Sequence, residues 1–201
     1  MPSRPARGAL RGTHRPAARR PLDPGDPRRG RGPRRGAGSL GAIANVGGMR
    51  ILVLAVGRIK ERYVAAAVED FARRLRPYLP LELAEVQAAH GGDPTAAMRE
   101  EGERILTRLA PDDVIWLLER DGEEWSSREL AQRVEGVMHG GAGRLVVVVA
   151  GTYGADAALR ARATRLWSLS RLTLLHEWAR ALALEQMYRA MKILRNEPYH
   201  H

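Results

Sequence analysis

Residues 145–154 read Leu-Val-Val-Val-Val-Ala-Gly-Thr-Tyr-Gly, an apolar run that passes directly into a loop with two glycines. A short, valine-rich run of this kind is typical of a strand buried on both faces of a sheet. Residues 51–56 (ILVLAV) and 114–118 (VIWLL) show the same pattern. The three runs predict buried strands of a parallel sheet.

Helical patterns separate these runs. Asp93-Pro94 is an N-cap followed by proline at the first helical position, and Ser126-x-x-Glu129 is a capping box. Strands that alternate with helices predict an α/β domain with a mostly parallel sheet covered by helices on both faces. The expected helices span 61–76, 93–109, 126–139, 157–164 and 177–194, with a half-exposed strand at 81–86 and a short apolar piece at 172–174.

Composition excludes several classes of protein. The chain has 201 residues and no cysteine, so disulfide scaffolds, thiolate metal sites and cysteine nucleophiles are excluded. No apolar run approaches the roughly 18 residues that cross a bilayer. The 33 Lys and Arg against 23 Asp and Glu give a net charge of +10, which favours a nucleic-acid partner.

The charge is concentrated in residues 1–48, which hold 11 Arg, two Asp, 10 of the 21 Gly and 7 of the 12 Pro. Such a segment cannot bury enough apolar surface to offset its ordering entropy, so we expect disorder. Three interpretations remain open: an upstream artefact with Met49 as the natural start, a basic RNA-binding arm, or a targeting peptide. The expected domain is therefore 49–201.

Ligands of parallel α/β sheets bind at the carboxyl ends of the strands. Here those ends are Glu119–Gly122 and Ala150–Gly154. The second loop is neither a dinucleotide fingerprint nor a P-loop, and a tight turn without a ligand explains its glycines equally well. His176 alone is more often structural than catalytic.

The C-terminal region carries most of the domain's surplus positive charge, which is compatible with RNA at this edge or with solvated helix faces. The helix at 177–194 has apolar stripes wide enough for a subunit interface as well as a core. The basic residues concerned are Arg160, Arg162, Arg165, Arg171, Arg180, Arg189, Lys192 and Arg195.

Three motifs together resemble a known family. The last stretch contains Ser170-x-x-Thr173-Leu174-x-His176-x-x-x-Arg180, then Glu185-Gln186-x-Tyr188-Arg189-Ala190, and Pro198-Tyr199-His200. Residues 117–131 (LLERDGEEWSSRELA) and the opening Met49-x-Ile51-x-x-x-Ala55-Val56-Gly57-x-x-Lys60 match further parts of the pattern. In these motifs residues 49–201 resemble the ribosomal RNA large subunit methyltransferase H family, which belongs to the SPOUT superfamily.

The resemblance implies a C-terminal trefoil knot and a cytoplasmic homodimer. It also implies transfer of a methyl group from S-adenosylmethionine to N3 of a pseudouridine in 23S rRNA within the assembled ribosome, without a metal. The implied cofactor-binding residues are Leu118, Ala150, Gly151, Leu169, Ser170, Arg171, Leu172, Thr173 and Leu174. As catalytic residues we expect Arg180, stabilising an anion or phosphate, and Tyr199 and His200, holding base or cofactor.

Two departures from the family pattern motivate an alternative function. Ala150 stands where the family has glycine, and Leu175 stands where it has proline. A catalytically weak ribosome- or RNA-binding module that keeps the fold is therefore the second hypothesis.

Overall fold

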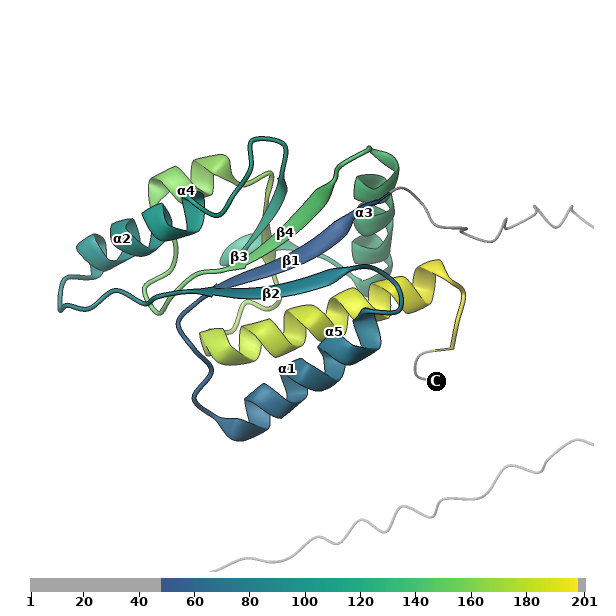
Figure 1. The fold of residues 1–201 in the computed structure, drawn as a ribbon, viewed down its shortest axis with the longest axis horizontal. Coiled ribbons are helices and arrows are strands. Elements are labelled where there is room, and N and C mark those ends of the chain that lie inside the picture. Colours follow the sequence, from purple (N-terminus) through teal and green to yellow (C-terminus); the bar gives the residue numbers. More distant parts are fainter. Residues whose placement is uncertain (1–47, 199–201) are drawn as a thin grey trace, which may run out of the picture. The chain divides into compact units, whose positions relative to one another are not determined.

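Five strands alternate with five helices in the computed structural model, which describes residues 48–198 (Figure 1). The strands are β1 (Arg50–Val56), β2 (Leu81–Val86), β3 (Val114–Glu124), β4 (Arg144–Val149) and β5 (Arg165–Ser168). The helices are α1 (Arg62–Leu75), α2 (Pro94–Leu106), α3 (Ser127–His139), α4 (Ala157–Arg162) and α5 (His176–Leu194). Residues 1–47, on which most of the predicted disordered tail falls, and residues 199–201 lie outside the described part.

The strands form one parallel sheet in the order β2-β1-β4-β3-β5. The central strands β1 and β4 are built from the valine- and leucine-rich runs, and Val53 pairs with Leu83 on one side and Val147 on the other. All carboxyl ends of a parallel sheet meet at one edge, so residues 118–121 of β3 and the loops after β4 and β5 converge there.

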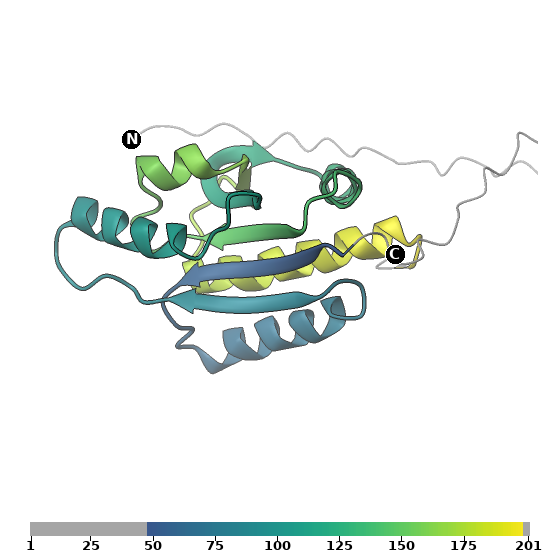
Figure 2. The ribbon, with the colours of Figure 1, turned by 45° about the horizontal axis from the view of Figure 1, so that its top comes forward.

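Helices cover both faces of the sheet, as predicted (Figures 1 and 2). One face, including Ile51, Val53 and Val147, packs against α1, α3 and α5. The other, including Leu54 and Val148, packs against α2 and α4 through Ile105 and Leu159. Because successive side chains of a strand point to opposite faces, continuous apolar runs are needed to fill both layers.

Local signals set the helix starts. The carboxylate of Asp93 accepts hydrogen bonds from the N–H groups of Thr95 and Ala96, and Pro94 is the first helical residue of α2. Ser126 and Glu129 form the complete capping box at the start of α3. Both predicted caps are confirmed, although α2 ends at Leu106, three residues earlier than predicted.

One prediction about the end of the sheet is wrong. β3 does not stop at Leu118 but continues to Glu124 after a register shift. The strand beside it is Arg165–Ser168, which the sequence did not predict, and the apolar piece at 172–174 forms no strand. Gly122 explains the shift, because a Cβ there would lie 2.7 Å from the Leu166 backbone. A glycine lets the two backbones pass at this distance.

Tryptophans anchor β5 to the sheet. Trp167 stacks on Trp125 with ring centroids 5.4 Å apart, and both rings meet Trp116 edge-on. Trp116 and Trp167 are buried. A short four-residue strand thereby gains a large apolar contact, which fixes where the loop after it begins.

Candidate active site

Residues 118–121 of β3 and the loops after β4 and β5 line a cavity of about 330 Å³ at the carboxyl edge of the sheet. Its walls combine apolar side chains, such as Leu118 and Leu172, with backbone of the glycine-containing loop and polar side chains from β3. A cleft of this size, lined by both apolar and polar groups, is typical of a small-molecule site.

Eight of the nine residues expected to bind cofactor line this cavity. They are Leu118, Ala150, Gly151, Leu169, Ser170, Leu172, Thr173 and Leu174. The exception is Arg171, whose side chain is exposed and forms an ion pair with Glu124 at 3.0 Å. The sequence motif therefore identifies three chain segments that the fold brings together, while ligand binding by these residues stays a prediction.

The loop after β4 is a tight turn that presents backbone to the cavity. The N–H of Gly154 donates to the carbonyl of Gly151 at 3.1 Å, and Gly154 has a φ of 87°, a conformation that favours glycine. Gly151 has no room for a side chain, because Oε2 of Glu101 occupies the place of a Cβ. The close contact at Gly151 and the positive φ of Gly154 thus account for the two glycines.

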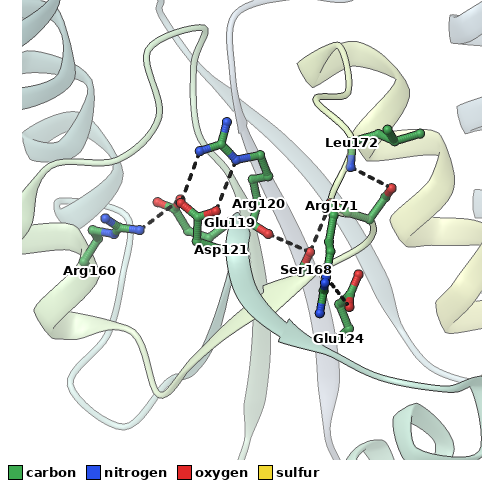
Figure 3. Close-up of polar contacts among 9 residues, drawn as sticks. Glu119, Arg120, Asp121, Glu124, Arg160, Ser168, Arg171 and Leu172 are labelled. Atoms are coloured by element: carbon green, nitrogen blue, oxygen red, sulfur yellow. Dashed lines mark hydrogen bonds and ion pairs between the residues drawn. The ribbon is translucent and has the colours of Figure 1, made fainter.

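Acidic and basic side chains alternate along the β3 wall (Figure 3). Glu119 pairs with Arg160 at 3.1 Å, and Arg120 pairs with Asp121 at 3.2 Å. Burial raises the pKa of Glu119 above its ordinary value, although the nearby Arg160 opposes the shift. The four charges balance, so this wall presents paired rather than free ions to a ligand.

Ser168, the last residue of β5, links β3 to the loop after β5. Its buried hydroxyl lies 2.9 Å from the carbonyl oxygen of Arg120 and 3.1 Å from that of Ser170 (Figure 3). Ser170 in turn accepts a hydrogen bond from the N–H of Leu172 at 3.0 Å. The polar residues in this segment therefore shape the cavity wall.

His176, the first residue of α5, also lines the cavity. Burial lowers the pKa of His176, and the positive charge of Arg180 lowers it further. The imidazole is therefore held towards its neutral form. The sequence favoured a structural role for this histidine, but its position leaves it facing any ligand that enters.

Arg180 lies outside this cavity. Only 3% of the residue is exposed, and its guanidinium donates to Glu85 at 2.9 Å and to the carbonyl oxygens of Val56 and Gly57 at 2.5 and 2.9 Å. It borders instead a second, mostly apolar cavity of about 230 Å³ between β1, β2 and α5. These bonds tie α5 to the end of β1, so the direct catalytic role expected from the sequence stays a prediction. Tyr199 and His200 lie outside the described residues.

Although sequence reasoning named the strand ends at 119–122 and 150–154, it gave no cofactor-binding or catalytic role to several residues that line the cavity. They are Glu119, Arg120, Asp121, Val149, Thr152, Tyr153, Gly154, Trp167, His176 and Ala179. Most follow directly on a predicted strand end, and that position was the available signal. Within residues 48–198 no group of three His, Asp or Glu side chains could hold a metal ion. None of the helices in that range is both long and apolar enough to cross a membrane.

Comparison with known proteins assigns the chain to a family. A family model described as predicted SPOUT methyltransferase matches residues 49–200. A ribosomal RNA large subunit methyltransferase H from Geotalea daltonii is 40% identical over 153 residues, which are 76% of this chain and all of that protein. The protein of the same name from Pelobacter propionicus is 42% identical over the same coverage.

A solved structure, that of a probable methyltransferase from Bordetella pertussis Tohama I, is a more distant likeness, with a TM-score of 0.45 and 18% identity over 73% of this chain and 95% of that one. The sequence matches span the strands, helices and cavity described above. This chain belongs to the ribosomal RNA large subunit methyltransferase H family of SPOUT methyltransferases.

Proposed function

We propose that this enzyme transfers a methyl group from S-adenosylmethionine to N3 of a pseudouridine in 23S rRNA within the assembled ribosome. The observation that carries the proposal is the convergence of three chain segments on one cavity in a chain whose relatives are named for methylation of ribosomal RNA. The assembled ribosome is a cytoplasmic particle, so the same proposal assigns the enzyme to the cytoplasm.

The cavity suits S-adenosylmethionine in size and chemistry. A volume of about 330 Å³ falls in the range of small-molecule sites. The leucines suit an adenine ring, and backbone groups of the loop after β4 can bind polar groups of the cofactor. The residues proposed to hold the cofactor are the eight that line the cavity, Leu118, Ala150, Gly151, Leu169, Ser170, Leu172, Thr173 and Leu174. Arg171 remains in the proposal only as a residue at the edge.

The bound cofactor supplies an electrophilic methyl group on a positively charged sulfur. The nucleophile is an imide nitrogen that is protonated at neutral pH, so its proton must leave as the new N–C bond forms. Positioning of the cofactor and the target base by the three chain segments that line the cavity can supply most of the rate enhancement. We propose that Tyr199 and His200 hold base or cofactor, and that His176, which is kept neutral, contacts the ligand from the first turn of α5.

The family resemblance extends the proposal to a trefoil knot around the cavity and to a homodimer. In this chain α5 buries most of its apolar side chains in its own core, including Leu184, Met187 and Met191. Trp178 and Ile193 stay exposed near its two ends. The dimer proposal therefore depends on the family rather than on a wide free apolar stripe of α5.

Two measurements on the full chain test the function. Calorimetry with S-adenosylhomocysteine reports whether the cavity binds the nucleoside cofactor. Incubation with labelled S-adenosylmethionine and bacterial ribosomes that lack the modification, with free 23S rRNA in parallel, reports transfer. We expect binding, and label as N3-methylpseudouridine in ribosomal 23S rRNA only. Ribosome binding without cofactor binding or transfer would instead support the RNA-binding module.

A further inference from the structure

The arginines that the sequence offered for RNA contact are already bound within the chain. Three of them near the cavity form ion pairs, and Arg162 donates to the carbonyl oxygens of Ala110 and Pro111. The pairs are Arg160–Glu119 at 3.1 Å, Arg165–Glu123 at 3.3 Å and Arg171–Glu124 at 3.0 Å. A phosphate would have to compete with a carboxylate for each of them.

The segment between β1 and α1 provides cations without such partners. The side chains of Arg58, Lys60 and Arg62 are exposed, and none takes part in an ion pair or side-chain hydrogen bond within residues 48–198. Glu61 is the one carboxylate in this short segment. The segment therefore presents a local excess of positive charge to solvent.

Glu177 fixes this segment beside the cavity. Its Oε2 accepts hydrogen bonds from the backbone N–H of Lys60 at 3.1 Å and of Glu61 at 3.4 Å. The preceding residue, His176, lines the cavity, and the charge of Lys60 contributes to the lowered pKa of that histidine. The free cations thus lie along the rim formed by the first turn of α5.

An exposed aromatic ring stands next to these cations. Tyr63 is 59% exposed, and its ring lies against that of Trp178 with centroids 5.9 Å apart. Cations that track the phosphate backbone, combined with an exposed ring on which a base can stack, are the usual parts of a surface for unpaired RNA.

We propose that Arg58, Lys60, Arg62 and Tyr63 form the surface that holds the RNA strand beside the reacting nucleotide. The cations bind phosphates and position the strand, and the tyrosine ring stacks on a neighbouring base. The inference builds on the proposed function, because it takes the cavity as the place where the target base is methylated.

The test uses the full chain with two triple variants of α1 and the segment before it. Arg58→Gln/Lys60→Gln/Arg62→Gln removes the free cations. Arg73→Gln/Arg74→Gln/Arg76→Gln removes the same number of charges from the other end of α1, where each arginine has an acidic partner, Asp70 or Glu69. Residues 1–48 are common to both variants, so their effect cancels.

Ribosome binding is measured by co-sedimentation over a range of KCl concentrations. We expect the first variant to bind at least tenfold more weakly, and the slope of log affinity against log salt to fall by about 2, since each phosphate contact on a single strand contributes roughly 0.7. The control variant should bind within about twofold of the wild type. Affinity for S-adenosylhomocysteine should stay unchanged in both.

Equal weakening in the two variants, or none in the first, would overturn the proposal. So would a change of sedimentation coefficient in the first variant alone, because the surface would then be a subunit contact. Wild-type protein that binds ribosomes but transfers no methyl group would reject the proposed function and leave the binding surface standing, so the two failures are distinguishable.

Discussion

The carboxylate of Glu101 packs directly against Gly151, with Oε2 in the place that a Cβ of residue 151 would occupy. Glu101 is only 6% exposed, and its Oε1 accepts a hydrogen bond from the N–H of Ala89 at 3.0 Å. Because the carboxylate is buried and held, it cannot move aside freely. The packing of Glu101, a residue of α2, against Gly151 therefore fixes the position of the loop after β4.

Substitution of Gly151 by alanine should displace this loop. Overpacking against a held side chain costs about 1–3 kcal/mol of stability, and we expect at least tenfold weaker binding of S-adenosylhomocysteine. Urea unfolding and calorimetry measure the two effects. Ala150→Gly, which adds no atoms, is the matched control and should bind about as well as the wild type.

The double variant Glu101→Ala/Gly151→Ala tests the cause. Removing the carboxylate makes room for the new methyl group, so part of the lost affinity should return. If Gly151→Ala alone binds the cofactor normally, the tight contact does not control the loop.

We expect Arg180→Met to lower the free energy of unfolding, and not only the rate of methyl transfer. It leaves the carbonyl oxygens of Val56 and Gly57 without their donor, and the loss of charge-assisted hydrogen bonds predicts about 2–3 kcal/mol in urea unfolding. Glu85→Gln keeps those two bonds and breaks a partly exposed ion pair, so it should cost about 1 kcal/mol or less.

The sequence prediction for Arg180 gives the opposite pattern. A catalytic arginine would leave stability near that of the wild type and reduce methyl transfer by a large factor, with S-adenosylhomocysteine binding unchanged. Measuring stability, binding and transfer on the same Arg180→Met preparation decides between the two roles.

Acidification should destabilise the protein through His176. Burial and the charge of Arg180 hold its pKa in the folded chain below the ordinary value of 6.5. The unfolded chain therefore binds a proton first, and stability is lost as the pH falls below about 6.5 towards the folded pKa. His176→Gln removes this contribution, so the variant should lose less stability than the wild type between pH 7 and pH 5. If urea unfolding shows that the wild type and His176→Gln lose equal stability over this pH range, the lowered pKa of His176 is contradicted.

Much of this fold was predictable because its signals are local. The runs at 51–56 and 145–149 had to be buried strands, and Asp93 and Ser126 cap their helices wherever the helices pack. The continuation of β3 was not predictable, since its polar residues 119–124 read as a loop. They pair with β5 because Gly122 and the tryptophans bring the two backbones together, which is a tertiary effect.

The residues of the candidate site divide in the same way, into those that the sequence predicts and those whose role depends on tertiary contacts. Leu118, Gly151 and Leu174 were placed by motif, and the fold brings their segments to one cavity. Arg180 carries the same weight in the motif, yet its burial against Val56 depends on the crossing of α5 over β1, which no spacing along one helix reveals. A motif thus identifies a group of residues that belong to one site. Only the structure shows which of them line the cavity and which of them support the fold.

Ser168→Ala should loosen the cavity from the β5 side. The single hydroxyl proton of Ser168 can serve the carbonyl oxygen of either Arg120 or Ser170, and these carbonyls belong to β3 and to the loop after β5. Its loss predicts about 1 kcal/mol lower stability. If the loosened cavity wall becomes ordered only when the ligand binds, the same free energy is lost from binding, and the affinity for S-adenosylhomocysteine falls about fivefold. Ser170→Ala is the matched control, because within residues 48–198 the Ser170 hydroxyl accepts from Leu172 in its own loop, and its loss should have the smaller effect on residues 119–124 of β3. Hydrogen exchange of residues 119–124 separates the two variants: faster exchange in Ser168→Ala alone supports the link between β3 and the loop after β5, and equal exchange in both rejects it.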